Sequence, residues 1–223
     1  MFCIPYAGCG ASVFRRWPHN VEGIDLLPLE LPGRETRLAE PILETYQDLA
    51  ASMIADLECY LDVPYAFFGH CWSALAAYEV TAELHEGSRP DPARLFVSSQ
   101  VAPQDGPVGR MLGMDDTELA TEVRATICAL GGTPHPELVS MYAEVLRADV
   151  DVSRRYRVAD PVRLSCPITA IGWTEDDEVR PEQMAGWSAC GDTSFTVLPG
   201  GHRRFTEAPP DLLRLLCTSL RTQ

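Results

Sequence analysis

Short runs of apolar residues recur along the chain, and each run is bounded by Gly, Pro or polar residues. The segments with the character of buried strands are residues 2–6, 24–32, 65–70, 94–100, 166–173 and 194–200. Segments with a helical pattern lie between them, at residues 11–20, 44–60, 73–86 and 210–221. Strands that alternate with helices are typical of α/β proteins with a mostly parallel sheet. The pattern therefore predicts an α/β fold whose buried strands are joined by crossover helices.

Residues 103–160 interrupt this alternation. A loop that contains Pro and Gly leads into two long segments of helical pattern. Asp115 and Glu118 have the spacing of an N-terminal capping box, and the pair Gly131–Gly132 is a suitable stop signal. A helical insertion between two strands favours a lid over a site at the strand ends. The alternative is an ordinary helical subdomain that gates nothing.

Composition narrows the classes of function. The 223 residues suffice for one sizeable core, so we expect a single domain over 1–223 with a lid insertion at about 103–160. A net charge of −14 repels nucleic acid and anionic lipid. No apolar run approaches the ~20 residues that a membrane span requires, and no signal-peptide pattern opens the sequence. We therefore expect a cytoplasmic monomer that binds neither nucleic acid nor membrane.

The eight cysteines are scattered through apolar or helical segments, without a C-x-x-C pair. Because no histidine lies at the spacing of a metal site with them, the sequence predicts no bound metal. Free cysteine is among the most buried residue types. Five of the eight are accordingly expected to be buried, namely Cys3, Cys59, Cys128, Cys166 and Cys217.

Cys71 is an exception because of the sequence around it, FFGHCWSALAAYEV at residues 67–80. A strand that ends in a G-x-nucleophile-x-small turn and opens into a helix presents the central side chain on a strained backbone. Gly69 lies two residues before Cys71, and the small Ser73 lies two residues after it. The start of a helix also favours the thiolate form of a cysteine. The pattern predicts a nucleophile, and a buried structural cysteine is the alternative.

A nucleophile of this kind needs a base, and the base needs an acid that orients it. Among the five histidines, His202 stands out because it follows a strand and two glycines, and so lies on a loop. Asp176 comes directly after the predicted strand that ends at residue 173, whereas its neighbours Glu175 and Asp177 are interpreted as surface charges. The chain order Cys71, Asp176, His202 is the order of α/β hydrolases.

Eight motifs follow one another along nearly the whole chain: FCIPYAGCGASVF, LPLELPGRETRL, FFGHCWSALAAYE, LFVSSQVAP, LGGTP, VLRADVDVSRRY, CPITAIG and LPGGH. Together they resemble the type II thioesterases that accompany modular polyketide and nonribosomal peptide synthases. The resemblance implies an α/β-hydrolase fold with a helical lid. It also implies hydrolysis or release of an acyl chain that an acyl or peptidyl carrier protein presents on its phosphopantetheine arm, with no cofactor and through an acyl-Cys71 intermediate.

Two further expectations come from the resemblance. Carried over by position, the oxyanion hole would be formed by the backbone N–H groups of Ala7 and Trp72. A strand usually precedes the FCIPY motif in this fold, so we expect that the sequence starts late relative to the family.

The chain departs from the family at the reaction centre. Family members usually have Ser at the nucleophile, Met after it and Gly two residues after it, where this chain has Cys71, Trp72 and Ser73. They usually have two aromatic residues after the loop histidine, where this chain has Arg203 and Arg204. We expect these two arginines to contact the phosphate of a carrier protein.

The cysteine leaves two other enzymatic functions open. Thioester-to-thioester exchange is nearly isoenergetic, which suits an acyl or aminoacyl transferase between carrier proteins. Dieckmann-type cyclases also use a cysteine here, but they place their acid soon after the strand that in this chain reads LFVSSQ. Ser98 and Ser99 occupy that stretch, which counts against a cyclase. A binding module without catalysis is the remaining alternative.

Overall fold

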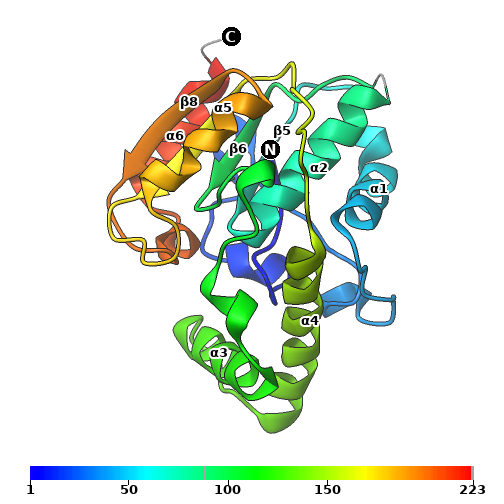
Figure 1. Ribbon diagram of the computed structural model, residues 1–223, viewed down its shortest axis with the longest axis vertical. Helices are drawn as coiled ribbons and strands as arrows, with labels where there is room; N and C mark the ends of the chain where they lie inside the picture. Colours follow the sequence, from blue (N-terminus) through cyan, green and yellow to red (C-terminus); the bar gives the residue numbers. More distant parts are fainter. Residues whose placement is uncertain (88, 222–223) are drawn as a thin grey trace.

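The computed structural model describes residues 1–87 and 89–221, so residues 88 and 222–223 of the predicted domain lie outside the described residues. A six-stranded sheet in the order β4-β1-β5-β6-β7-β8 forms its centre (Figure 1). All neighbouring strands of this sheet pair in parallel. The predicted α/β class with a mostly parallel sheet is therefore confirmed.

The strands are β1 Phe2–Cys3, β4 Leu27–Pro28, β5 Ala66–His70, β6 Arg94–Ser98, β7 Ile168–Trp173 and β8 Thr193–Leu198, with a separate antiparallel pair, β2 Asn20–Val21 and β3 Ile24–Asp25. The α-helices are α1 Tyr46–Leu57, α2 Trp72–Glu86, α3 Asp116–Ala129, α4 Pro136–Arg155, α5 Trp187–Cys190 and α6 Pro210–Arg221. Short 3-10 helices are η1 Ala11–Phe14, η2 Glu35–Arg37, η3 Glu58–Tyr60, η4 Pro103–Asp105, η5 Arg110–Gly113, η6 Pro181–Gly186 and η7 Arg204–Glu207.

The central strands are buried along their whole length. Every residue of β5 and β7 is buried, as is every residue of β6 after its first. Helix α2 packs against β5 and β6, and α1 packs against α2. A parallel strand covered on both faces has no solvent side, which explains why these segments read as continuous apolar runs rather than as alternating patterns.

Two predicted strands and one predicted helix are shorter than expected. The ladder beyond β1 continues through the Ile4 N–H, which donates to the Phe68 carbonyl at 2.9 Å, and Pro5 then offers no donor. The segment 24–32 divides between β3, which pairs with β2, and β4, which pairs with β1. The helix expected at 11–20 is only η1, and Pro18 lies just beyond it.

The segment between β6 and β7 is helical, as its pattern indicates. Asp115 accepts hydrogen bonds from the Thr117 and Glu118 N–H groups, and the Glu118 side chain accepts from the Asp115 N–H, so the predicted capping box is confirmed. The predicted stop also holds, because Gly131 follows α3 with a φ of +79°. Helices α3 and α4 pack together at the end of the molecule below the sheet in Figure 1.

The cysteine predictions are correct in part. Cys3, Cys166 and Cys217 are buried, but Cys59 and Cys128 are exposed. Cys59 lies in η3, a short turn at the surface after α1, and Cys128 lies near the C-terminal end of α3, where few side chains pack over it. No helix within residues 1–87 and 89–221 combines the length and apolar character that a membrane crossing demands.

The turn after β5 allows a direct test. A Cβ atom on Gly69 would lie 2.1 Å from the Ser73 carbonyl oxygen, a backbone atom that cannot rotate away. We therefore expect Gly69→Ala to lower the free energy of unfolding by about 2 kcal/mol or more, as overpacking does. Urea unfolding of the purified variant measures this loss.

Gly113→Ala is the matched control, because no heavy atom lies within 4 Å of the Cβ position at Gly113. Its unfolding free energy should change by less than about 0.5 kcal/mol. Equal stability of the two variants would show that the turn between β5 and α2 is not closely packed.

Candidate active site

Cys71 lies at the carboxyl end of β5 and is the N-cap residue of α2. Its φ of 54° and ψ of −118° are unfavourable for a residue with a side chain. The Cys71 N–H donates to the Ser98 carbonyl at 2.8 Å, which fixes this backbone to the end of β6. The local geometry is that of a nucleophile turn between a strand and a helix.

Ser73 takes part in the same turn. Its side chain is fully buried, and its hydroxyl accepts from the His70 N–H at 2.9 Å. The Ile4 carbonyl, 3.1 Å from the same hydroxyl, is an available acceptor for its proton. The departure from the glycine of the family is therefore accommodated, because the added hydroxyl satisfies backbone groups of the turn.

His202 and Asp176 lie together, as the sequence predicts. The Asp176 carboxylate oxygens are 3.0 and 3.1 Å from His202 Nδ1. Asp176 also accepts from the backbone N–H groups of Glu178 and Val179, at 2.9 and 3.0 Å, and from the Ser99 hydroxyl at 2.6 Å. Four donors thus hold this carboxylate in one orientation.

The environment of the pair shifts both protonation equilibria. Burial lowers the pKa of His202, but the Asp176 hydrogen bond, the neighbouring Cys71 side chain and the negative charge of Glu178 outweigh burial and raise this pKa to about 10. Burial raises the pKa of Asp176, but its bonds to His202 and Ser99 outweigh burial and hold this pKa well below the usual range. Burial, and then the charge on His202, hold the pKa of the neighbouring His70 well below its ordinary value.

The other candidate acids of the sequence, Glu175 and Asp177, and the remaining histidines are not part of the pair. Glu175 and Asp177 are exposed, in agreement with their interpretation as surface charges. His70 is 1% exposed and stacks on Phe205 with ring centroids 4.1 Å apart. His19 and His135 are exposed.

Glu178 is a site residue that the sequence analysis did not identify. Its side chain is only 3% exposed, and its Oε1 lies 3.6 Å from His202 Nε2. The Sγ atom of Cys71, a carboxylate oxygen of Glu178 and a ring nitrogen of His202 all lie within 4.8 Å of one another. The acidic cluster TEDDEV contained the signal, but nothing in it distinguished the carboxylate that points inward beside Asp176.

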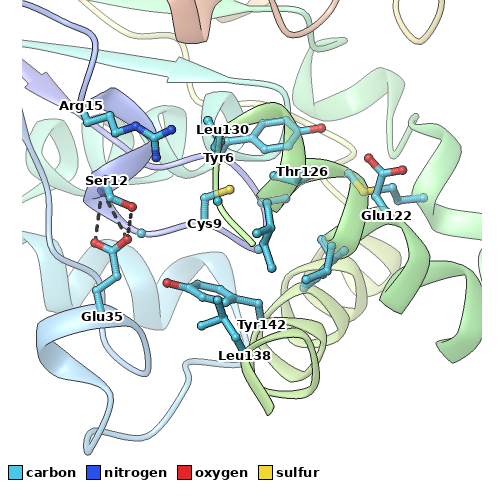
Figure 2. Close-up of a pocket in the computed structure, with 18 residues that line it drawn as sticks. Tyr6, Cys9, Ser12, Arg15, Glu35, Glu122, Thr126, Leu130, Leu138 and Tyr142 are labelled. Atoms are coloured by element: carbon cyan, nitrogen blue, oxygen red, sulfur yellow. Dashed lines mark hydrogen bonds between the residues drawn. The ribbon is translucent and has the colours of Figure 1, made fainter. Parts of the chain in front are cut away.

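A cavity of about 160 Å³ lies between the loop after β1 and the helices α3 and α4 (Figure 2). Its apolar lining on the helices consists of Val123, Ile127, Leu130, Leu138 and Leu146. Tyr6 and Ala7 line it on the loop side, and the Tyr6 ring also contacts the His202 ring at 6.0 Å between centroids. The cavity therefore starts beside the Cys71 and His202 region and extends under α3 and α4.

Arg203 and Arg204 do not form a basic patch. Arg203 pairs with Glu122 of α3, and Arg204 pairs with Glu207. The depression of about 720 Å³ beside His202 is lined by four arginines and four carboxylates, namely Arg16, Arg110, Arg203, Arg204, Glu175, Asp177, Glu178 and Glu207. The depression beside His202 therefore lacks the net positive charge that the two arginines suggested.

A buried ion pair clamps the loop after β1. Arg34 and Asp149 are 2% and 1% exposed, and the guanidinium donates to both carboxylate oxygens, at 2.9 and 3.1 Å. Asp149 also accepts from the Gly8 N–H at 2.8 Å, and Arg34 donates to the Cys9 carbonyl at 3.1 Å. No local pattern pairs these two residues, although LPGRE and LRADVD both belong to the quoted motifs.

Trp72 connects the nucleophile turn to the same clamp. Its indole N–H donates to the Asp149 carbonyl at 2.9 Å, and the Arg34 guanidinium lies 5.7 Å from its ring centroid. The side chain is 4% exposed, so its bulk is packed against α4. Trp72 is also the first residue of α2, where the backbone N–H has no acceptor within the helix.

The Ala7 N–H is the second expected oxyanion donor. Among the hydrogen bonds of residues 1–87 and 89–221, none is donated by this group. Ala7 precedes Gly8, whose φ of +68° and bond to Asp149 set the course of the loop. A free N–H on a clamped loop beside the cavity is suited to bind an oxygen that gains negative charge.

A family model for the thioesterase domain matches residues 1–220. The chain belongs to the thioesterase domain family. Gramicidin S biosynthesis protein GrsT of Aneurinibacillus migulanus is 32% identical to this thioesterase over 99% of the chain and 88% of its own length. The medium-chain S-acyl fatty acid synthase thioesterase of Homo sapiens is 29% identical over 91% of the chain and 79% of its own length.

Solved structures agree with this membership. The RedJ thioesterase from the prodiginine pathway of Streptomyces coelicolor superposes with a TM-score of 0.80 at 34% identity, over 98% of this chain and 89% of RedJ. The type II thioesterase BorB from the borrelidin biosynthetic cluster superposes with a TM-score of 0.81 at 28% identity, over 99% and 91% of the two chains. The protein is thus a thioesterase-type enzyme with the α/β-hydrolase fold.

The buried ion pair between Arg34 and Asp149 leads to a prediction for stability. Asp149→Ala would leave the buried Arg34 guanidinium without its carboxylate and the Gly8 N–H without its acceptor. We expect the free energy of unfolding to fall by about 3–5 kcal/mol, the usual cost of breaking a buried pair. Urea unfolding of the variant measures this loss.

Asp151→Ala is the control, because Asp151 lies in the same helix but pairs with Arg154 at 38% side-chain exposure. Its loss should stay below about 1 kcal/mol. Replacing both members of the buried pair, as Arg34→Met with Asp149→Leu, should cost less than Asp149→Ala alone. A mild effect of Asp149→Ala, similar to that of Asp151→Ala, would contradict the clamp.

Proposed function

We propose that this thioesterase releases acyl chains that are held as thioesters on the phosphopantetheine arm of an acyl or peptidyl carrier protein in polyketide or nonribosomal peptide biosynthesis. The observation that carries the proposal is the placement of Cys71 at a strained nucleophile turn within reach of His202, which Asp176 orients. The names of GrsT, RedJ and BorB support the biosynthetic context, since each refers to such a pathway or cluster.

The proposed reaction begins with attack by Cys71 Sγ on the thioester carbonyl, and His202 takes the thiol proton where the thiol is protonated. The Ala7 and Trp72 N–H groups stabilise the oxyanion of the tetrahedral intermediate. Its collapse breaks the bond to the arm sulfur, which leaves as a thiol with the proton from His202. Water then attacks the acyl-Cys71 with His202 as base, and the free acid and the Cys71 thiol are released.

The helices α3 and α4 are proposed as the lid of this site. They cover the 160 Å³ cavity, and an engineered apolar cavity of about 150 Å³ binds benzene, so the enclosed space suits a short acyl chain. The Arg203–Glu122 pair joins the His202 loop to α3. Movement of α3 would release Arg203, and in that open state Arg203 and Arg204 could bind the phosphate of the carrier arm, as their position suggested.

Acyl transfer to a second thiol is the alternative that one observation favours. The Asp176 hydrogen bond, against the effect of burial, raises the pKa of His202, which favours the charged imidazolium beside Cys71. A cation there stabilises a thiolate, which exchanges acyl groups readily with other thiols. The cyclase alternative loses support. Cyclases of this type place their acid soon after the strand that corresponds to β6, whereas here Ser99 occupies that place and donates a hydrogen bond to Asp176.

The first test measures transfer of the acyl group to the enzyme. Cys71→Ala should abolish the acyl-enzyme, since the proposed nucleophile is gone while the turn tolerates a smaller side chain. Intact-mass spectrometry of the protein mixed with an acyl-loaded carrier protein reads out both the acyl-enzyme and the unloaded carrier. Cys128→Ala, which removes an exposed cysteine of α3, is the control and should load like the wild type. Acyl-enzyme formation by Cys71→Ala would eliminate Cys71 as the nucleophile.

The second test separates hydrolysis from transfer. If water is the natural acceptor, Cys71→Ser should keep turnover within about tenfold of the wild type, or about 1.4 kcal/mol in activation free energy, because His202 and the oxyanion donors resolve an acyl-serine in the same way. Free acid released from an acyl-carrier protein is the quantity to measure. A Ser variant that stalls as a stable oxyester, with slow hydrolysis by the wild type, would favour transfer instead.

A further inference from the structure

Several buried polar atoms in and beside the site lack a protein partner among the described residues, and Tyr6 Oη and His70 Nε2 are two of them. Within residues 1–87 and 89–221, His202 Nε2 and Glu178 Oε2 have no hydrogen-bond partner. Their side chains are 4% and 3% exposed. The 3.6 Å between His202 Nε2 and Glu178 Oε1 is too long for a hydrogen bond. Buried polar atoms without partners are uncommon in folded proteins, and they frequently mark a place for an ion or ligand.

Together with Glu178 and His202, Cys71 forms a set of three potential metal ligands of different chemistry. Its Sγ atom, a Glu178 carboxylate oxygen and a His202 ring nitrogen lie within 4.8 Å of one another. Thiolate, imidazole and carboxylate are the ligands that Zn²⁺ takes in proteins, at bond lengths of about 2.0–2.3 Å, and a tetrahedral site then spaces its ligands roughly 3.4–3.6 Å apart. The three atoms, which lie within 4.8 Å of one another, approach this spacing.

We propose that Cys71, Glu178 and His202 bind a divalent metal ion of the zinc class and that the bound ion blocks the nucleophile. A sulfur coordinated to zinc cannot attack a thioester while it remains a ligand. Three protein ligands leave a fourth position for water. Metal binding would therefore inhibit the enzyme reversibly. The ion would be held by Cys71 and His202, which carry the proposed reaction, and by the additional carboxylate of Glu178.

The surroundings of the three ligands fit this role. Asp176 lies 3.0 Å from His202 Nδ1 and holds one proton there, so the second proton of the imidazolium is at Nε2, where a bound metal ion would replace it. A carboxylate behind a histidine is the usual support of a zinc-binding imidazole. Glu178 is oriented as well, because Arg110 donates to its Oε1 at 2.9 Å and its own backbone N–H donates to Asp176. The free Oε2 is thus the oxygen available to the ion.

The local charge balance does not exclude a cation. Arg110 and Arg203 lie close to the site and would repel a metal ion. Glu122 pairs with both of these arginines, so their charge is partly neutralised before a metal binds. The thiolate and the Glu178 carboxylate then supply the negative charge that the ion requires.

Co²⁺ is a spectroscopic probe for this site, because its absorption spectrum reports the ligands without any substrate. We expect one equivalent of Co²⁺ to produce a thiolate-to-cobalt charge-transfer band in the near ultraviolet, together with visible bands of tetrahedral intensity. Zn²⁺ should abolish these bands because it binds such ligands more tightly than Co²⁺ does. An excess of Mg²⁺, which prefers oxygen ligands in octahedral geometry, should leave them unchanged.

The titrations are made in a Cys59→Ser, Cys128→Ser background, which removes the two exposed thiols. Glu178→Gln should weaken Co²⁺ binding at least about tenfold, since even residues behind a ligand contribute this much. Glu175→Gln, which changes an exposed carboxylate of the same loop, should bind Co²⁺ like the background protein. An absent charge-transfer band, or equal binding by the two Gln variants, would refute the site.

Alkylation provides a readout on the unmutated protein, which stays informative if Glu178→Gln fails to fold. Zn²⁺ should slow the modification of Cys71 by iodoacetamide while Cys128 reacts at its usual rate, as measured by peptide mass mapping. Unchanged reactivity of Cys71 at saturating Zn²⁺ would overturn the proposal. Because the proposal rests on the geometry of the proposed active site and not on turnover, its failure would leave the thioesterase function standing.

Discussion

The ion pair between Arg34 and Asp149 is the interaction on which the rest of the site depends. It joins residues 115 positions apart in the sequence and lies where neither charge reaches water. Two charges are removed from water only at a large cost, which close bidentate geometry and additional hydrogen bonds must offset. Here the additional bonds go to the Gly8 N–H and the Cys9 carbonyl, so the pair fixes the loop that carries Ala7. A packed apolar pair would fill the same space but could not bond that backbone.

A second carboxylate organises the opposite side of the site in the same manner. Asp176 accepts from Ser99, from two backbone N–H groups of its own loop and from His202, so it cannot turn away from the imidazole. The bond from Ser99 connects the end of β6 to the loop after β7. Parallel strands bring these ends to one edge of the sheet, and the reactive groups meet there because the fold places all strand ends together.

Local patterns predict much of this molecule, and long-range packing accounts for what they miss. Strand β5, the turn at Cys71 and the capping box at Asp115 are each specified within a few residues, so the sequence indicates them directly. The inward turn of Glu178 and the pairing of Arg34 with Asp149 depend on segments distant in the chain. Likewise, helical periodicity does not tell whether Cys128 faces a neighbour or solvent, which is why its burial was predicted wrongly.

The residues around the proposed nucleophile show which property of the site differs from the family pattern. Ser73 fits the turn through its own hydrogen bonds, and Trp72 packs on α4 while its backbone stays at the start of α2. Both side chains are held by hydrogen bonds within this chain, so among the three departures at the turn the sulfur of Cys71 is the one that changes the reacting atom. Sulfur is the better nucleophile toward thioesters and also the stronger ligand for soft metal ions. The tautomer that Asp176 imposes on His202 serves both properties, because the lone pair that accepts a proton is the one that can bind a metal.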